Sequence, residues 1–311
     1  MLQLDALELA ARLDRLQLID ALERAFRADY RTPPRHHHPI GGEAVAAGTL
    51  LLMPAWQEGG MIGVKLVTVF PGNAARAAPT VHATYTLFDA GTGVPIALLD
   101  GTELTRRRTA ATSALAARFL ARPDASRLLM IGTGAMAPHL IASHRRVRPI
   151  RSVRIWGRRP ERAAALAQTM SDADFDVETT VDLEASVRWA DVVSCATLTE
   201  TSLVRGEWLR CGQHLDLIGA FTPQMREADD AALSRSHIYV DTRWGALAEA
   251  GEIVQGIASG AITPADIRGD LHDLTRGSAV ARTSADEITL FKSVGSAIED
   301  LAAATLAVRG L

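Results

Sequence analysis

The chain has 311 residues, of which 48% are hydrophobic and 22% are charged, and its formal net charge at pH 7 is −3. A slightly acidic chain offers no electrostatic case for binding nucleic acid or an anionic membrane surface. No apolar run reaches the length of a membrane span, and the first residues lack the basic stretch and apolar core of a secretory signal. We therefore expect a cytoplasmic protein, and the length favours two domains.

The first third of the chain predicts helices followed by a sheet. Apolar residues at helical spacing indicate one or two helices over residues 5–30. Residues 32–42 are rich in Pro, His and Gly and are expected to form a loop. Strand-like segments follow at residues 49–53, 61–70, 82–88 and 94–99. A tight turn at residues 91–93 joins the last two, so we expect an α+β domain with an antiparallel or mixed sheet.

The rest of the chain predicts alternating strands and helices. An Ala- and Leu-rich helix over residues 109–121 ends before Pro123. Short apolar strands are then expected at residues 127–131, 153–156, 177–180, 192–196, 214–218 and 238–240. Helices between them are expected after residue 135 and at residues 161–170 and 183–189. Such repeated βα units predict an α/β domain with a doubly wound parallel sheet. A last helix over residues 294–308 either caps this domain or returns to the first.

A glycine-rich turn follows the first strand of the second block. The strand ends in Gly132-Thr133-Gly134-Ala135-Met136-Ala137, a Gly-x-Gly-x-x-Ala pattern that opens a helix. Gly132 permits a tight turn, Gly134 lets the backbone approach a pyrophosphate, and Ala137 lets the helix pack close to the strand. The helix N-terminus offers N–H groups and a positive dipole end to the anion. Glycines also mark ordinary turns, but this context favours a Rossmann NAD(P)-binding domain with residues 132–136 at the coenzyme.

The second strand of this block ends without the acidic residue that usually binds the ribose hydroxyls of NAD. The residues at that point are Gly157-Arg158-Arg159-Pro160. A guanidinium group can hold a phosphate with paired donors. We therefore expect NADP(H) rather than NAD(H), with the 2′-phosphate on Arg158 or Arg159. The alternative is a solvated Arg pair at the start of a helix.

Three cations of the first block are candidates for binding a carboxylate. Lys65 lies in a predicted strand with apolar neighbours, where a charge is unfavourable unless it faces solvent or a polar cleft. Arg108 ends a run of three Arg at the predicted start of a helix, where cations oppose the helix dipole. Arg35 lies in the Pro- and His-rich segment. Together they would form a carboxylate pocket, although each taken alone is more often a surface cation.

Three consecutive histidines, His36, His37 and His38, lie in the same segment. Metal ligands on one face of a helix or strand need a different spacing, so we expect no metal site there. The chain has no Ser-His-Asp order, P-loop or His-Glu-x-x-His motif, which leaves hydrolase and kinase functions without support.

Several motifs give the chain a resemblance to the ornithine cyclodeaminase/μ-crystallin family. They include Leu52-Met53-Pro54-Ala55, Gly63-Val64-Lys65-Leu66-Val67, Arg108-Thr109-Ala110-Ala111-Thr112-Ser113-Ala114, Gly219-Ala220 with Pro223, and Phe291-Lys292-Ser293-Val294-Gly295. The Arg-Thr-Ala-Ala-x-Ser segment, followed within one helix by the glycine turn, is the most specific. The resemblance implies a homodimer. It also implies a substrate and dimerisation domain of residues 1–117, completed by a C-terminal helix at 294–311, and a Rossmann domain of residues 118–293.

The same resemblance implies roles for individual residues. Lys65 and Arg108 are expected to bind the substrate carboxylate and to be the catalytic residues, and Thr80 is expected in the substrate pocket. Arg35 matches the family's loop arginine. Thr197 and Lys292 are expected beside the coenzyme. A partly desolvated lysine near other cations has a lowered pKa, so Lys65 is also a candidate proton donor.

One position departs from the family's cyclodeaminases. Those enzymes carry an Asp after the Gly-Gly or Gly-Ala pair for acid/base work on the amino group, whereas this chain has Phe221, which we expect to line the substrate pocket. A phenyl ring cannot transfer a proton. The resemblance is therefore closer to the family's reductases, and the Arg158-Arg159 segment resembles the NADPH-using μ-crystallin branch.

These observations predict a reductase that uses NADPH on a cyclic imino acid, such as pyrroline-2-carboxylate or piperideine-2-carboxylate, or on a related keto or imino acid. Three alternatives stay open. They are an ornithine cyclodeaminase that recycles NAD and releases ammonia, an alanine-type amino-acid dehydrogenase, and a non-catalytic coenzyme-binding protein. Assays of ammonia release and of NADPH absorbance separate them.

Overall fold

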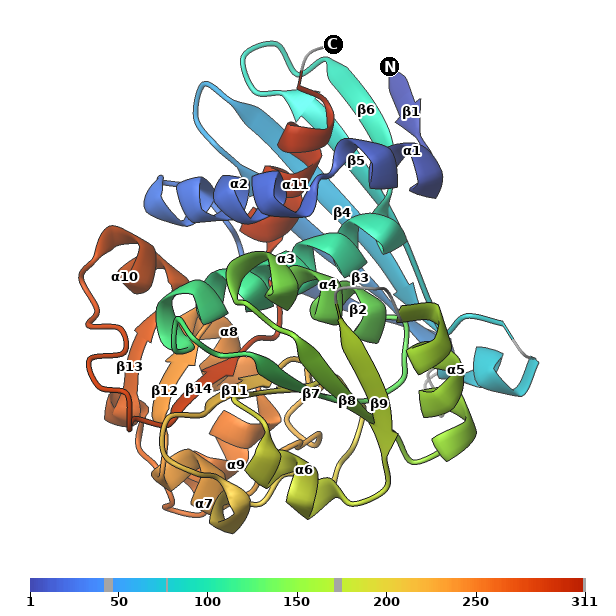
Figure 1. The fold of residues 1–311 in the computed structure, drawn as a ribbon. Helices are drawn as coiled ribbons and strands as arrows, with labels where there is room; N and C mark the ends of the chain where they lie inside the picture. Colours follow the sequence, from blue (N-terminus) through green and yellow to red (C-terminus); the bar gives the residue numbers. More distant parts are fainter. Residues whose placement is uncertain (42–46, 77, 171–174, 310–311) are drawn as a thin grey trace. The chain divides into compact units, whose positions relative to one another are not determined.

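The structure is a computed structural model that describes residues 1–41, 47–76, 78–170 and 175–309. The chain divides into two compact units, which we describe separately (Figure 1). Unit 1 comprises Met1–Thr109 and Ser296–Leu311, and unit 2 comprises Ala110–Gly295. The first division falls inside helix α3 (Gly101–Leu120), which also contains the boundary expected after residue 117.

Unit 1 is built on a six-stranded sheet in the order β1-β6-β5-β4-β3-β2. Its strands are β1 (Leu2–Leu4), β2 (His36–Ile40), β3 (Gly48–Trp56), β4 (Met61–Val69), β5 (Val81–Asp89) and β6 (Pro95–Asp100). Neighbouring strands are antiparallel except β1 and β6, which are parallel. A 3-10 helix, η1 (Pro71–Arg76), lies between β4 and β5. The mixed sheet predicted for this block is confirmed.

The loop expected over residues 32–42 is wrong in part, because five of these residues form the edge strand β2. β2 pairs with β3 along its whole length, and all its residues are exposed. An edge strand tolerates proline, because one side of its backbone forms no ladder hydrogen bonds. Pro39 is therefore compatible with a strand here, although Pro-rich composition usually indicates a loop.

The described part of unit 1 contains the helices α1 (Ala6–Arg12), α2 (Arg15–Arg27) and α11 (Ala297–Ala307), together with the start of α3. The side chain of Asp14 caps α2, which buries an apolar stripe at helical spacing along its length. Helix α11 contacts α2 as well as β3, β4 and β5. The last helix of the chain therefore returns to the first unit (Figure 1).

Unit 2 is built on an eight-stranded parallel sheet in the order β13-β12-β14-β11-β10-β7-β8-β9. Its strands are β7 (Arg127–Ile131), β8 (Ser152–Trp156), β9 (Asp176–Thr180), β10 (Val192–Cys195), β11 (His214–Leu217), β12 (His237–Val240), β13 (Ile267–Asp270) and β14 (Thr289–Lys292). The predicted doubly wound sheet is confirmed. The prediction misses β13 and β14, which are only four residues long.

Helices cover both faces of this sheet. Besides α3, they are α4 (Ala137–Val147), α5 (Pro160–Met170), α6 (Leu183–Trp189), α7 (Asp230–Ser234), α8 (Arg243–Glu249), α9 (Gly251–Ala258) and α10 (Leu271–Arg276), with 3-10 turns η2 (Gly206–Trp208) and η3 (Pro264–Asp266). Leu128 and Met130 pack with residues of α3, α4 and α5, whereas Leu129 and Ile131 pack with residues of α6 to α9. Successive residues of β7 thus enter opposite cores, as expected of a strand buried on both faces.

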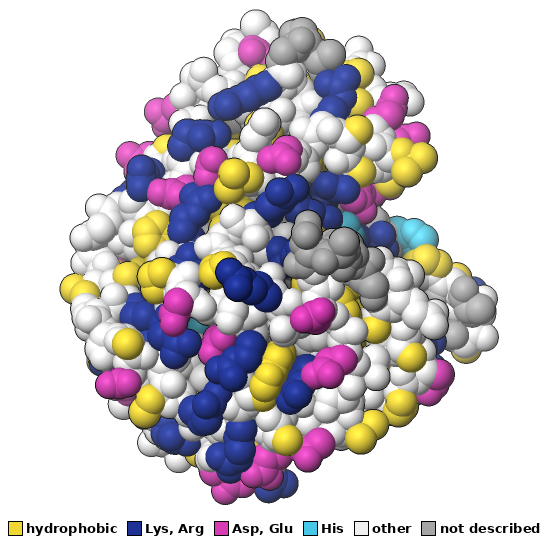
Figure 2. All heavy atoms as spheres, viewed as in Figure 1, with side chains coloured by type: hydrophobic (Ala, Val, Ile, Leu, Met, Phe, Trp, Pro, Cys, Tyr) yellow, Lys and Arg dark blue, Asp and Glu magenta, His cyan; other side chains and the backbone are white. Residues whose placement is uncertain are grey.

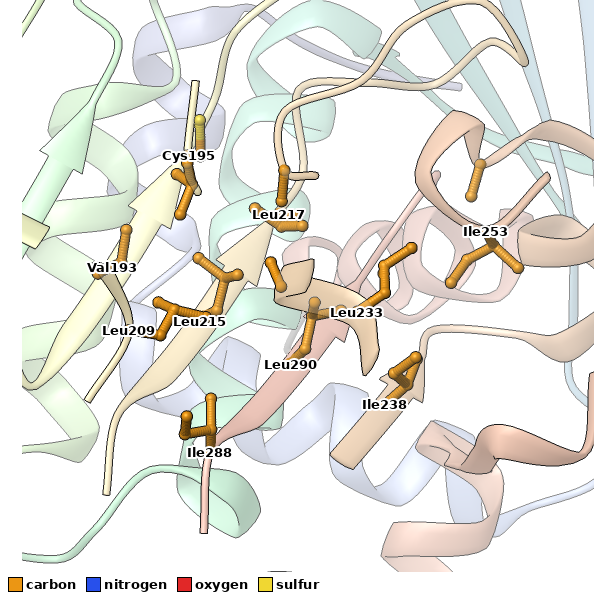
Figure 3. Close-up of a cluster of buried hydrophobic side chains, with 14 of the residues drawn as sticks. Val193, Cys195, Leu209, Leu215, Leu217, Leu233, Ile238, Ile253, Ile288 and Leu290 are labelled. Carbon is orange, nitrogen blue, oxygen red and sulfur yellow. The ribbon is translucent and has the colours of Figure 1, made fainter. Parts of the chain in front are cut away.

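Figure 3 shows the second of these cores, with Val193, Leu215 and Leu290 projecting from neighbouring strands toward Leu233 and Ile253. Basic and acidic side chains are interspersed over the faces in view in Figure 2. Among the described residues, no helix combines the length and apolar character that a membrane crossing requires.

Candidate functional site

The turn after β7 has the geometry of a dinucleotide-binding loop. Gly132 adopts φ = 114°, and its N–H donates to the carbonyl of Trp156 at 2.9 Å. A Cβ at this position would lie 2.6 Å from the carbonyl oxygen of Ala196, so only glycine fits without strain. The first glycine therefore makes the tight turn that the sequence predicts for it.

The next glycine faces open space. A Cβ at Gly134 would meet no atom within 4 Å, and Gly134 and Ala135 are both exposed. Helix α4 begins three residues later, behind Met136, and no side chain caps its N-terminus. Ala137 is 1% exposed against the sheet. A bare backbone beside an uncapped helix N-terminus fits a bound pyrophosphate.

The two arginines after β8 lie at the same carboxyl edge of the sheet. Arg158 and Arg159 are exposed and precede α5. A Cβ at Gly157 would lie 2.6 Å from Cγ2 of Thr133, so the loops after β7 and β8 are in contact. This contact places the arginines beside the glycine turn.

The strand register of unit 1 shows which residues lie beside Lys65 on its face of the sheet. Lys65, on β4, lies opposite Met53 of β3 and Tyr85 of β5. Residues that face each other across antiparallel strands share one face of the sheet. Extending the β2–β3 register by one residue places Arg35 opposite Met53, on that same face. Lys65 is only 2% exposed.

A carboxylate pair on α11 brings Lys65 and Arg108 together. Lys65 Nζ lies 2.7 Å from Oδ2 of Asp300, and Arg108 Nε donates to Oδ1 of the same carboxylate at 2.8 Å. Arg108 Nη1 also pairs with Glu299. Arg108 is 4% exposed, and both acidic side chains are fully buried. The two predicted cations therefore occupy one buried cluster.

The cluster changes the pKa of its members. Burial, with the charges of Arg108 and Arg35, lowers the pKa of Lys65 to about 8, although Asp300 acts in the opposite direction. Burial also opposes the charge of Arg108, but Asp300 and Glu299 raise the pKa of its guanidinium above the usual value. Lys65 is therefore the member that can release a proton near neutral pH.

Sequence reasoning misses Asp300 and Glu299, although the chain contains a signal for them. Ser296 and Glu299 form a capping box, in which the Ser296 N–H donates to Glu299 Oε1 at 3.2 Å. The helix that follows is otherwise apolar on all sides, so its first-turn acids have no polar face to occupy. Acidic residues in a helix of this kind need buried partners.

The three arginines of α3 lie in its second turn, not at its start, because the helix begins at Gly101 rather than at residue 109. Their expected conflict with the helix dipole is therefore wrong, since the effect is confined to the first turn. Arg107 donates to Glu103 at 2.7 Å and to the carbonyl of Leu13 at 3.1 Å. Of the three, Arg108 is the one that joins Lys65.

Thr80 belongs to unit 1 but not to this cluster. Thr80 precedes β5, and its carbonyl accepts from the N–H of Phe70 at 2.8 Å. It lies five residues before Tyr85, a distance of about 16 Å along a strand. Phe221 belongs to unit 2, in the loop after β11, and is 38% exposed.

Thr197 and Lys292 meet at a buried glutamate in unit 2. Glu227 Oε1 accepts from the N–H of Thr197 at 2.7 Å and from its hydroxyl at 2.9 Å, and Oε2 accepts from the N–H of Gly219 at 2.8 Å. Lys292 Nζ lies 3.9 Å from Glu227 and 3.0 Å from Glu252, and it is fully buried. Glu227 thus joins the loops after β10 and β11, and Lys292 balances its charge.

The histidines of β2 are exposed at the edge of the sheet. His36 and His38 lie on one face with their ring centroids 6.3 Å apart. Within the described part of the chain, no three His, Cys, Asp or Glu side chains are grouped as metal ligands.

Comparisons with known proteins agree with this geometry. The chain matches the ornithine cyclodeaminase/mu-crystallin family over residues 1–309. A Delta(1)-pyrroline-2-carboxylate reductase of Paracoccus denitrificans is 44% identical over 263 residues, which cover 84% of this chain and 83% of the relative.

Two solved structures share the whole fold. The Delta(1)-pyrroline-2-carboxylate reductase of Thermococcus litoralis, in complex with NADH and L-proline, has a TM-score of 0.93 at 32% identity and covers 99% of this chain and 96% of its own. An archaeal alanine dehydrogenase dimer with bound NAD has a TM-score of 0.91 at 31% identity and covers 99% of this chain and 94% of its own. This chain therefore belongs to the ornithine cyclodeaminase/mu-crystallin family.

Proposed function

We propose that this protein reduces the C=N bond of a small cyclic imino acid with a nicotinamide coenzyme as the hydride source. The observation that carries the proposal is the buried cluster in which Asp300 joins Lys65 to Arg108. A guanidinium and an ammonium held side by side recognise a carboxylate. Relatives named Delta(1)-pyrroline-2-carboxylate reductase, one of them with L-proline bound, support a five-membered ring as substrate.

Each residue of unit 1 has a separate task in this reaction. Arg108, together with Arg35, binds and orients the substrate carboxylate. Lys65 gives a proton to the ring nitrogen while the bound coenzyme supplies hydride to the adjacent carbon. A donor whose pKa is about 8 is protonated at neutral pH and transfers its proton readily. Lys65 then regains a proton from water.

The coenzyme would be held by unit 2, with its pyrophosphate on residues 132–136 and its adenosine ribose beside Arg158 and Arg159. We propose NADPH as the preferred form, because two exposed guanidinium groups occupy the place where NAD-binding domains of this type carry an acid. Thr197, in the loop after β10, would lie on the nicotinamide side. Lys292 would support that loop from the interior through Glu227, rather than touch the coenzyme.

Phe221 favours a reductase over a cyclodeaminase. A cyclodeaminase must move protons at the α-amino group between two hydride transfers. The loop after β11 carries a phenyl ring, 38% exposed, at the position where the family's cyclodeaminases carry the acid, and this ring cannot take up or release a proton.

We further propose a homodimer formed through unit 1. Because side chains alternate along a strand, the residues next to Lys65 on β4 point away from α11. One of them, Leu66, is 41% exposed although β4 lies inside the sheet, and Leu52, which lies opposite it on β3, is only partly buried. Apolar side chains in the open on a sheet face mark an association surface. The alanine dehydrogenase described as a dimer supports this assignment.

The decisive experiment measures NADPH oxidation with Delta(1)-pyrroline-2-carboxylate, beside ornithine with ammonia detection and pyruvate with ammonium. We expect turnover of the cyclic imine, loss of at least about 100-fold in kcat/KM for Lys65→Met or Arg108→Gln, and no ammonia from ornithine. Ammonia release without net coenzyme oxidation would instead identify a cyclodeaminase. Reduction of pyruvate in preference to the imine would identify an alanine dehydrogenase.

A further inference from the structure

Lysine is nearly absent from this chain, which makes its two occurrences informative. Of the 33 Lys and Arg residues, only Lys65 and Lys292 are lysines. Both are buried, with exposures of 2% and 0%, and each forms ion pairs with buried carboxylates. Arginine provides every other positive side chain, exposed or buried. The two side chains differ in chemistry, because an ammonium can release its proton near neutral pH and a guanidinium cannot.

The two acids of α11 contact the cation cluster differently. Asp300 bridges it, with one oxygen 2.7 Å from Lys65 Nζ and the other 2.8 Å from Arg108 Nε. Glu299 pairs with Arg108, and its second oxygen accepts from the N–H of Ser296 at the start of the helix. Removal of Asp300 should therefore change the pKa of Lys65 more than removal of Glu299.

We propose that Asp300 is a positioning residue for the reduction: it fixes the ammonium of Lys65 beside Arg108 and keeps it protonated until the imine nitrogen takes the proton. This inference rests on the proposed function. The hydride adds to the imine carbon, the C=N π electrons form the new N–H bond, and the proton comes from Lys65. Lys65 is left as a neutral amine that water reprotonates. Asp300 stays ionised and exchanges no atom with the substrate.

Lys65 and Arg108 are surrounded by titratable groups from several elements. Asp300 and Glu299 come from α11, Arg108 from α3, Tyr85 from β5 and Arg35 from the segment before β2. Thr105 of α3 adds a hydroxyl 3.4 Å from Nζ. Burial and the two arginines favour the neutral amine, whereas the negative charge of Asp300 opposes them. Asp300 is therefore the group that keeps the proton on Lys65.

The carboxylate of Asp300 is itself kept ionised by its two cationic neighbours. Burial opposes its charge, but Arg108 and Lys65 lower the pKa of Asp300 below its usual value, so it remains ionised through the neutral range. An ionised acid in contact with both cations holds the ammonium beside Arg108 and stabilises its charge. A fixed donor position is what proton transfer to a ring nitrogen requires.

The test observes Lys65 directly and does not depend on turnover. Protein labelled with ¹⁵N at lysine Nζ gives two side-chain signals, which Lys292→Arg assigns. We expect Asp300→Asn to lower the pKa of Lys65 by at least about one unit, because it removes the favourable charge and leaves burial and two cations. Glu299→Gln is the matched control. It removes the charge that pairs with Arg108 and leaves the contact between Asp300 and Lys65 in place, so the pKa of Lys65 should move by less than half of the Asp300→Asn shift.

Activity supplies the second readout. The alkaline limb of the kcat profile should move to lower pH in Asp300→Asn by the shift seen for the Lys65 signal, and should stay near its original position in Glu299→Gln. Asp300→Glu, which keeps the charge, should restore the wild-type limb while lowering kcat about tenfold through the displaced donor. A folded Asp300→Asn whose Lys65 signal titrates as in wild type overturns the inference.

The remaining outcomes are also decisive. Should Asp300→Asn fail to fold, Asp300→Glu takes its place, and an unchanged kcat in that variant overturns the inference. The Lys65 signal could shift as expected while none of the imines tested supports NADPH oxidation by the wild-type protein. In that case the proposed function is wrong, and so is the role of Asp300 in reduction. If wild type is active but the limb does not follow the Lys65 signal, only the positioning role is wrong.

Discussion

Lys292 Nζ lies 3.0 Å from a carboxylate oxygen of Glu252 inside unit 2, and neither side chain reaches solvent. Glu252 also accepts the backbone N–H of Glu227 at 2.7 Å, and Glu227 lies on the other side of the lysine. The ammonium of Lys292 is thus the counter-charge for two buried carboxylates. Burial raises the pKa of Glu227, whereas Lys292 lowers it.

We predict that Lys292→Met lowers the free energy of unfolding by about 3–5 kcal/mol, because it leaves buried carboxylates without a counter-charge. Urea unfolding followed by circular dichroism measures the change. The double variant Lys292→Met with Glu252→Gln, which removes one acid together with the cation, should recover part of the loss. Equal stability of the single variant and wild type would show that the acids are already protonated.

Gly134→Ala is predicted to weaken coenzyme binding without affecting the fold. A methyl group there meets no protein atom within 4 Å, so the melting temperature should stay within about 2 °C. It would project into the space that a pyrophosphate needs, and we expect Kd to rise at least about tenfold in calorimetry. Gly132→Ala is the contrasting control, because its φ of 114° and the 2.6 Å approach to Ala196 predict lost stability as well.

Replacement of Arg158 by Asp together with Arg159→Ala is predicted to invert coenzyme preference. The guanidinium groups recognise the 2′-phosphate of NADPH, whereas an acid binds the ribose hydroxyls of NADH and repels that phosphate. We expect the ratio of kcat/KM for NADPH over NADH to fall at least about 100-fold. Both coenzymes should be tested at equal ionic strength, and Arg162→Ala, on the helix α5 that follows these two arginines, is a suitable control. An unchanged ratio would assign NADPH recognition elsewhere.

Acid is predicted to destabilise unit 2 through a second buried network. His214 donates to or accepts from Thr289 at 3.0 Å, and Asp216 on the same strand accepts from Ser194 at 2.7 Å. Burial is the main cause that lowers the pKa of His214 from 6.5 to about 3. The folded state therefore excludes a proton that the unfolded state binds.

The free energy of unfolding should consequently decrease as the pH falls from 6.5 toward 3, by at most about 1.4 kcal/mol per pH unit from this group. Burial opposes the charge of Asp216, but His144 and Ser194 lower its pKa, so it adds a further loss below pH 4. Urea unfolding at several pH values measures the slope. His214→Asn should reduce the slope of unfolding free energy against pH between pH 6.5 and 4.5. An unaltered slope would contradict the assignment of this pH dependence to His214.

The features that could be predicted from the sequence are local ones. The glycine turn at Gly132 and the arginines after β8 depend on neighbouring residues, and a strand followed by a helix fixes their place in the fold. The apolar strands β7, β10 and β12 were equally clear, whereas β13 and β14 lie in a part of the chain where no helices were predicted, so no alternation of strand and helix indicated them. Pro39 concealed an edge strand because its effect depends on which side of the backbone is paired.

Contacts between distant segments could not be predicted in this way. Lys65 was identifiable as a charge that needs a polar environment, but its partner depends on the return of α11 to unit 1. Asp300 is 192 residues away from Arg108 in sequence, and no periodicity connects them. The interior position of Lys292 is a similar case, because its neighbours Glu227 and Glu252 come from a loop and a helix that only the folded chain brings together.

The position of α11 has a consequence for biosynthesis. This helix emerges from the ribosome after all of unit 2, yet it carries the acids that neutralise Lys65 and Arg108 and it packs on β3, β4 and β5. Until translation reaches it, the nascent sheet presents an uncovered apolar face with unbalanced positive charges. Unit 2 can mature in the meantime as a continuous segment, so the vulnerable interval for chaperone capture or premature aggregation belongs to unit 1 alone.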